Sequence, residues 1–243
     1  MIPAIRAEAR RLLSLRSTGI FAALLIGCCF GPIIVMGIIY DPTYQGPIDA
    51  SDFGKCASIF HVLAIVFAGT YTATEIRSGS PAISFLTQKN RWSSLAAQYA
   101  VTSVFLTLTY VVGMCLALVT ALFYPDGLTM TGRGWAYLGL YGVIVLLWSL
   151  MATSLAVITR SVAAAVAAPI TWMLLIEQLM VQIPMLEKIT PWLPFTASHS
   201  LLTSALGQGS ADDTTAVTVL AVLVPALSLM GAASVLHGRR DAP

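Results

Sequence analysis

Apolar residues fall into six long runs that are separated by polar stretches. The runs cover about 17–40, 55–74, 93–123, 134–158, 162–183 and 215–237. A helix needs about 20 mostly apolar residues to cross a bilayer, and only helices or closed barrels satisfy their backbone hydrogen bonds in lipid. Because the runs are continuous rather than alternating, they predict an all-α membrane protein with six transmembrane helices. The third run is long enough to tilt, and Thr159-Arg160-Ser161 predicts a tight turn between the fourth and fifth.

The composition favours the same class of protein. Hydrophobic residues make up 57% of the chain and charged residues 10%, whereas soluble domains carry about 25% charged residues. The longest polar stretch runs only from Asp41 to Lys55, so we expect one membrane domain over residues 1–243. The basic N-terminal residues are followed by a full-length apolar run without a small-residue cleavage site, which argues against a cleavable signal peptide.

The basic residues predict the orientation in the membrane. With the N-terminus in the cytoplasm, the inner segments hold ten of the 13 Lys and Arg residues: Arg6, Arg10, Arg11, Arg16, Arg77, Lys89, Arg91, Arg160, Arg239 and Arg240. The outer segments hold only Lys55, Arg133 and Lys188. Because Lys and Arg are retained on the cytoplasmic side, we expect a multi-pass protein of the cell membrane with both termini inside.

Two segments outside the six runs also carry a helical pattern. Residues 1–16 place Ile5, Ala9, Leu12 and Leu13 on one side, which predicts an amphipathic helix in the inner interface or a simple topology anchor. Residues 184–209 contain Pro184, Pro191 and Pro194, so they cannot form one continuous helix. We interpret them as a broken, partly re-entrant outer element with a short helix at about 196–206.

The connection between the second and third runs, residues 75–92, combines charges with a short apolar stretch. Ser80 and Pro81 fit the first positions of a helix, and Ala82, Ile83, Phe85 and Leu86 give it one apolar flank. Such a helix parallel to the membrane can insert into a groove on a soluble partner. The alternative is a capped and solvated connection.

Residues that could perform chemistry are scarce. The sequence has no phosphate-binding loop, no H-E-x-x-H and no G-x-S-x-G, and His61, His199 and His237 are far apart. Cys28, Cys29, Cys56 and Cys115 have no metal-ligand spacing and are interpreted as small buried residues, without a disulfide or a metal. The chain therefore has no visible catalytic centre of its own.

Glu177 interrupts the apolar pattern of the fifth run. A carboxylate within a span costs about 2.5–3.5 kcal/mol, so its side chain should face protein or water. Glu177 could contact a cationic group of a substrate, together with Trp172, Gln178 and Gln182. The alternative is a hydrogen-bonded residue that holds helices together, or one that reaches water at the outer interface.

Small residues in the first run allow a close helix approach. Gly27 and Gly31 form a G-x-x-x-G pattern, and Pro32 follows it. We expect this surface to pack within one subunit, with packing between subunits as the alternative.

Residues 75–91 resemble the permease subunits of type-2 ABC exporters, a family of drug, antibiotic and polysaccharide exporters. In that family the second span ends in Glu, followed by a basic residue and Gly, an apolar helix, and a Leu-(Ser/Thr)-Pro-x-x-Arg stretch. The matching residues here are Glu75, Arg77, Gly79, Leu86, Thr87 and Arg91. Gln88 stands where proline is common, and Gln98 stands where the third span often carries Lys after Ala.

The resemblance implies that two permease subunits pair face to face, each docked on a separate ATP-binding subunit. The coupling residues would be Glu75, Arg77, Gly79, Pro81, Phe85, Leu86, Lys89 and Arg91. ATP and Mg²⁺ would bind the partner ATPase, so this chain would be no enzyme and hold no cofactor. The expected function is export of an amphiphilic drug, antibiotic or peptide through a permease pair of identical or different chains, without nucleic acid.

Two other functions remain open on the sequence. A membrane immunity protein that sequesters a peptide or antibiotic without transporting it would have the same composition. A polytopic membrane enzyme is a third interpretation, which the missing catalytic cluster disfavours. ATP-dependent transport in vesicles separates the first two.

Overall fold

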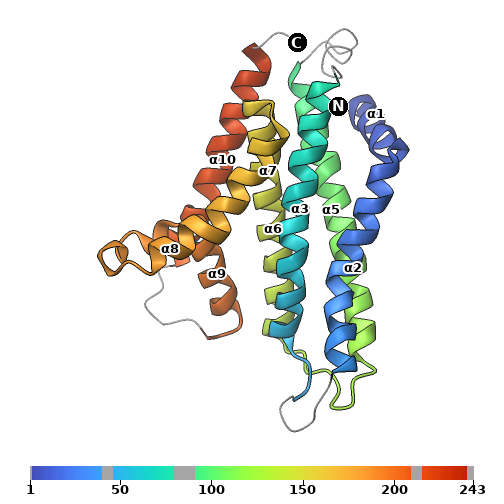
Figure 1. Cartoon of the computed structure of the whole chain (residues 1–243), viewed down its shortest axis with the longest axis vertical. Helices are drawn as coiled ribbons and strands as arrows, with labels where there is room; N and C mark the ends of the chain where they lie inside the picture. Colours follow the sequence, from blue (N-terminus) through green and yellow to red (C-terminus); the bar gives the residue numbers. More distant parts are fainter. Residues whose placement is uncertain (1, 40–45, 79–90, 209–214, 240–243) are drawn as a thin grey trace.

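The computed structural model describes residues 2–39, 46–78, 91–208 and 215–239 (Figure 1). Within these ranges the secondary structure is helical, apart from one isolated bridge between Ile48 and Leu128. The helices are α1 (Ile2–Ser14), α2 (Arg16–Ile38), α3 (Ala50–Arg77), α5 (Arg91–Ala121), α6 (Gly132–Thr159), α7 (Val162–Thr171), α8 (Glu177–Val181), α9 (Pro194–Ala205) and α10 (Thr215–Arg239). A π-helical turn, η1 (Trp172–Ile176), joins α7 to α8, and two 3₁₀ turns, η2 (Pro184–Leu186) and η3 (Thr190–Trp192), precede α9.

The prediction of an all-α chain with six candidate membrane spans is confirmed for the described residues. Six helical segments are long and apolar enough to cross a membrane: Arg16–Ile38, Ala50–Arg77, Trp92–Ala121, Gly132–Thr159, Val162–Val181 and Ala216–Arg239. Each lies within a few residues of the run that predicted it. The fifth span differs in kind, because it is built from α7, η1 and α8 rather than from one uninterrupted α-helix.

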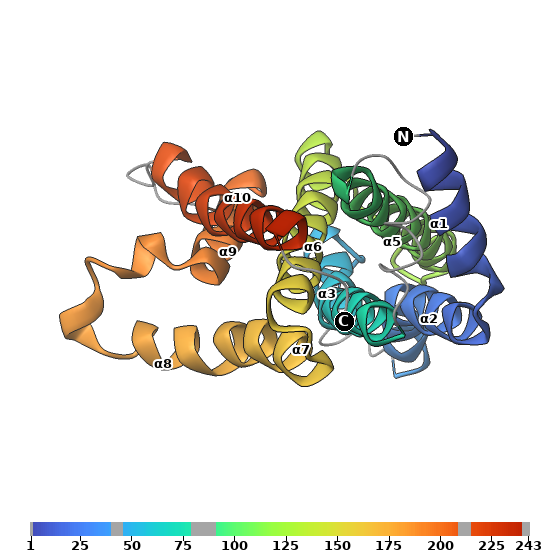
Figure 2. The same cartoon turned by 90° about the horizontal axis from the view of Figure 1, so that it is seen from above.

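The spans form two groups with α6 between them. Seen from above, α1, α2, α3 and α5 gather on one side, whereas α7–α8 and α9–α10 extend as two arms on the other (Figure 2). Both ends of the described chain, Ile2 and Arg239, lie at the same end of the bundle (Figure 1). We call this end the terminal pole; the turn between α6 and α7 also lies there, and the starts of α3 and α6 lie at the opposite pole.

Helix α3 forms the centre of the core. In its most apolar stretch 67% of the residues are buried, against 17% in α2, where most residues are partly or fully exposed. The ring of Phe67 lies 4.6 Å from Phe105 of α5 and 5.3 Å from Phe21 of α2, measured between centroids. On the other side of α3, the ring of His61 lies 5.9 Å from the ring of Trp148 of α6. Aromatic packing on both sides therefore fixes α3 between its neighbours.

Glycines allow the closest helix approaches, but not the pair expected from the sequence. A side chain at Gly54 would overlap the hydroxyl of Tyr137, and one at Gly113 would come within 2.6 Å of the Cβ of Cys29. At Gly27 and Gly31 a Cβ would meet no atom within 4 Å. The expectation that the G-x-x-x-G pattern packs within the subunit is therefore wrong for the described residues, since the contact of α2 with α5 runs through Cys29 instead.

Local signals set the ends of the helices, and α3 begins at Ala50, ahead of the predicted start at about 55. Asp49 caps α3 by accepting from the backbone N–H of Ser51 at 2.7 Å, and Asp52 bonds back to the N–H of Asp49 at 3.2 Å, forming a capping box. The tight turn after α6 is confirmed: Arg160 has a φ of 53°, and Ser161 caps α7. A residue in the left-handed region ends the α-helix and reverses the chain in two residues.

The broken element before the last span is also confirmed as broken. Residues 184–193 form only 3₁₀ turns, and the short helix expected at about 196–206 is α9, Pro194–Ala205. In Figure 1 α8 and α9 lie beside the bundle rather than beyond its lower end. Trp148 joins α9 to the core, because its indole N–H donates to Ser198 Oγ at 3.5 Å.

Helix α1 agrees in part with its predicted amphipathic pattern. Leu12 is buried, and Ile5 and Ala9 pack against the core, as expected. Leu13, which was placed on the same face, is 75% exposed, whereas Ala4 is buried. The apolar face of α1 is therefore centred on Ala4 and Leu12, and this face packs mainly against α5.

Candidate functional site

The first candidate site lies at the terminal pole, where α1 meets the end of α3. Glu75 is 7% exposed and forms an ion pair with the guanidinium of Arg11. The Tyr71 hydroxyl, one turn earlier on α3, donates to Glu8 Oε1 at 2.8 Å. Arg11 Nη1 lies 3.9 Å from Glu8 Oε2. We call these four residues, Glu8, Arg11, Tyr71 and Glu75, the α1–α3 cluster.

The α1–α3 cluster gives each carboxylate a donor from the opposite helix. Glu75 of α3 receives the guanidinium of α1, and Glu8 of α1 receives the phenol of α3. Helical spacing explains the grouping, since residues three or four apart in an α-helix share a face. Because a buried charge without a partner is costly, each helix stabilises the position of the other.

The predicted coupling residues divide into four sets in the structure. Glu75 was expected to couple to a partner ATPase, but its carboxylate is buried and paired with Arg11 of α1. Arg77 is exposed at the last turn of α3. Gly79, Pro81, Phe85, Leu86 and Lys89 lie outside the described residues, as does the expected short helix that they would form. Arg91 begins α5, and only its backbone is described.

The far end of the 75–92 connection is also anchored at the terminal pole. Ser94, in the first turn of α5, lies with its Oγ 3.2 Å from His237 Nε2 near the end of α10. A side chain at Gly238 would lie 3.6 Å from the Trp92 indole nitrogen, so the end of α10 passes close to the start of α5. The two ends of the connection are therefore held by different helices, α1 at one end and α10 at the other.

The sequence did not identify α1 and α10 as partners of the connection. Glu8 and Arg11 were assigned only to an interfacial helix, and His237 had no assigned role. A signal was present, because Glu8 and Arg11 are three residues apart and Tyr71 and Glu75 four apart, each pair on one helix face. Which two faces meet depends on tertiary packing, and the sequence does not encode that directly.

The second candidate site surrounds Glu177, which is fully buried. Its Oε1 accepts from Trp172 Nε1 at 2.6 Å and from the backbone N–H of Phe195 at 3.0 Å. Its Oε2 accepts from the backbone N–H of Thr196 at 2.8 Å and from Thr196 Oγ1 at 3.0 Å. Four donors thus converge on one carboxylate.

The donors explain why a carboxylate occupies this position. Helix α9 begins at Pro194, and its N-cap residue, Leu193, has no side-chain acceptor. The first N–H groups of a helix have no partner within the helix, and the N-terminus carries a partial positive charge. Glu177 therefore caps α9 from another segment, 18 residues earlier in the chain.

The other residues predicted near a substrate path do not converge on Glu177 in the same way. Gln178 and Gln182 are exposed, and Trp172 is 39% exposed while its indole N–H bonds Glu177. The hydrogen bonds of Glu177 agree with the structural alternative left open by the sequence, a residue that holds segments together. Substrate contact remains a prediction for Glu177, Trp172, Gln178 and Gln182.

Among the described residues no group of three or more His, Cys, Asp or Glu side chains is placed to hold a metal ion. His61 is 3% exposed among aromatic rings, His199 is exposed, and His237 lies beside Ser94. The four cysteines are free thiols. The hydrogen bonds and ion pairs of the two candidate sites thus join separate helices.

No protein-family model matches this chain, and no curated protein matches it. What is established is the fold of the described residues, a helical chain with six candidate membrane spans.

Proposed function

We propose that the chain is the membrane subunit of an ATP-driven exporter of the type-2 ABC class. A pair of such subunits would bind two separate ATP-binding subunits and move an amphiphilic drug, antibiotic or peptide out of the cell. The terminal pole would face the cytoplasm, since the described basic residues of the predicted inner set all lie on segments that end there. Residues 75–91 would be the coupling element, and 184–209 the outer, partly re-entrant element.

The observation that carries this proposal is the anchoring of both ends of the 75–92 connection. Arg11 holds Glu75 at the end of α3, and His237 lies against Ser94 at the start of α5. The connection joins two long spans, and the α6–α7 turn at the same pole has only two residues between helices. A push on a connection anchored in this way would be transmitted to α1, α3, α5 and α10 together, as a coupling element requires.

The test is binding to an ATPase and transport that depends on it. The tagged chain is purified from its native membrane, a co-purifying ATP-binding-cassette protein is identified by mass spectrometry, and the two proteins are placed together in vesicles. We expect ATP-dependent export by the pair and no ATP hydrolysis by the chain alone. Arg77→Ala should weaken binding of the ATPase because Arg77 is exposed beside the connection. Lys188→Ala, also exposed but in the 3₁₀ region between α8 and α9, is the matched control.

Two outcomes would contradict the proposal. Hydrolysis of ATP by the isolated chain would place the energy source within it. Retention of a peptide or antibiotic by the membrane without ATP-dependent transport would identify an immunity or sequestering protein instead. If Arg77→Ala and Lys188→Ala bind the ATPase equally well, the coupling surface lies elsewhere.

A further inference from the structure

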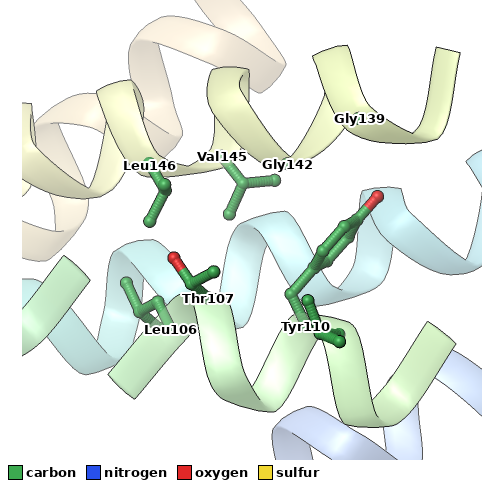
Figure 3. Close-up of a pocket in the computed structure, with 8 residues that line it drawn as sticks. Leu106, Thr107, Tyr110, Gly139, Gly142, Val145 and Leu146 are labelled. Carbon is green, nitrogen blue, oxygen red and sulfur yellow. The ribbon is translucent and has the colours of Figure 1, made fainter. Parts of the chain in front are cut away.

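A groove between α5 and α6 is not used by either candidate site. It has a cavity volume of about 190 Å³ and is lined on α5 by Leu106, Thr107, Tyr110 and Val111 and on α6 by Gly139, Gly142, Val145 and Leu146. In Figure 3 Thr107 and Tyr110 of α5 face α6, and Val145 and Leu146 of α6 face α5. An apolar cavity of about 150 Å³ stays dry and takes up a benzene-sized molecule. The groove is therefore large enough to hold part of an apolar molecule.

Two glycines keep the groove open. A side chain at Gly139 would meet no atom within 4 Å, so nothing from the chain fills this part of the space. At Gly142 a Cβ would lie 3.1 Å from Cε1 of Tyr110, which places the phenol ring against the α6 backbone. The depth of the groove thus comes from the missing side chains of α6.

The polar atoms in the groove already have partners. The Tyr110 hydroxyl donates to the backbone oxygen of Leu138 at 2.9 Å, and the Thr107 hydroxyl donates to the backbone oxygen of Ser103 at 2.8 Å. None of the eight lining residues is charged. A ligand with polar groups would lose its hydration without gaining partners here, so the lining selects a hydrocarbon.

The position of the groove identifies the source of that hydrocarbon. Its residues lie in the middle of two candidate spans, Trp92–Ala121 and Gly132–Thr159, at the depth of the lipid tails. Val104 and Leu108 of α5 and Val143 of α6 are exposed beside it, so the groove opens on an apolar outer surface. In a membrane this surface is bathed in acyl chains.

We propose that the α5–α6 groove is a binding site for one acyl chain of a membrane phospholipid. The chain lies against the backbone of α6 at Gly139 and Gly142, with the Tyr110 ring as its side wall. This site is independent of the exporter proposal, since it needs no partner subunit and no ATP.

The test uses the full chain in phosphatidylethanolamine and phosphatidylglycerol vesicles. The vesicles contain a trace of phospholipid with a photoreactive diazirine near the end of one acyl chain, and labelled peptides are measured by mass spectrometry after illumination. We expect several-fold more label on 106–111 and 139–146 than on the exposed residues of α10. Gly139→Leu fills the groove and should lower its label to the level of α10.

Two variants separate loss of the site from loss of the fold. Gly231→Leu makes the same change at an exposed glycine of α10 where a Cβ also meets nothing within 4 Å, and it should leave groove labelling unchanged. Leu146→Ala enlarges the groove and should raise its label above that of the unchanged chain, whereas an unchanged label would indicate bulk lipid. If Gly139→Leu fails to fold, Leu146→Ala still tests the site.

Three results would overturn the proposal. Equal labelling of α5, α6 and α10, unchanged in Gly139→Leu, would mean ordinary contact with bulk lipid. Labelling by a photoreactive free fatty acid but not by the phospholipid would identify a free amphiphile as the occupant. A further variant carries Gly139→Cys, with Cys115 replaced by Ser. If two copies of it form a cross-link and the lipid label is absent from the groove, a second chain covers the groove.

Discussion

Removing Arg11 should release α1 from α3 and destabilise the chain. The Glu75 side chain is 9% exposed and that of Arg11 is 32% exposed, so Arg11→Ala leaves a nearly buried carboxylate without its cation. Breaking a buried ion pair from one side costs about 3–5 kcal/mol. Because Arg11 is partly solvated, we expect a smaller loss, about 2–4 kcal/mol.

A double-mutant cycle separates the pair from its surroundings. Glu75→Gln keeps an acceptor for Arg11 and removes the charge, so it should cost only about 1 kcal/mol. In Arg11→Ala/Glu75→Gln no charge is left unpaired, so the double variant should be more stable than Arg11→Ala alone, with a coupling energy of about 1–3 kcal/mol. Arg10→Ala, an exposed arginine of the same helix, is the control and should be close to neutral.

Two measurements report on the pair. Thermal unfolding in detergent should shift by about 2–4 °C for each kcal/mol in a chain of this length. Amide hydrogen exchange over Ile2–Ser14 should rise in Arg11→Ala before exchange rises in α3, because α1 can open locally. The reasoning is refuted if Arg11→Ala is as stable as Arg10→Ala, or if adding Glu75→Gln to Arg11→Ala restores nothing.

Three further predictions concern other parts of the chain. Glu177→Ala should lower stability by about 3–5 kcal/mol and increase amide hydrogen exchange in α9, because four donors lose their shared acceptor. Glu177→Gln should lose less stability, and normal export of cationic substrates by this variant would exclude substrate contact of Glu177. Although burial of Asp49 opposes it, hydrogen bonds from Ser51 and Asp52 and the charge of Lys55 hold the pKa of Asp49 below its usual value. The charge-dependent part of its capping is present at neutral pH and lost as the pH falls through that lowered pKa. The stability difference between Asp49→Ala and the unchanged chain, about 1 kcal/mol at pH 7, should therefore shrink below about pH 4, and the two melting temperatures should converge. Gly54→Ala should cost about 1–3 kcal/mol through overlap with the neighbouring tyrosine ring, whereas Gly27→Ala, with open space, should be neutral or slightly stabilising in the same melting assay.

The spans could be predicted from the sequence because one physical property decides them. Helix length and apolar content are local, so the limits of α6 and the turn at Arg160 were found within a residue or two. The broken region before α9 was found for the same reason, since Pro184, Pro191 and Pro194 act on their own backbone.

Contacts between distant segments could not be predicted in the same way. The partner of Glu177 is the start of α9, and the partner of Glu75 is Arg11, 64 positions earlier. A sequence shows that a buried carboxylate needs donors, but it does not show which helix face supplies them. The G-x-x-x-G pattern at Gly27 shows the same difficulty, because the close contact between α2 and α5 is formed by Cys29 and Gly113 instead.

The capping of α9 by Glu177 sets an order on biosynthesis. As the chain leaves the ribosome, the fifth span reaches the translocon while Phe195 and Thr196 are still inside the exit tunnel, so Trp172 is the one donor of the four that can already reach Glu177. A carboxylate in a span raises the cost of insertion by about 2.5–3.5 kcal/mol. The fifth span should therefore be stably inserted only after α9 has emerged from the ribosome. A released chain that is truncated just before Pro194 should leave this span poorly inserted, and glycosylation-site mapping would reveal the loss.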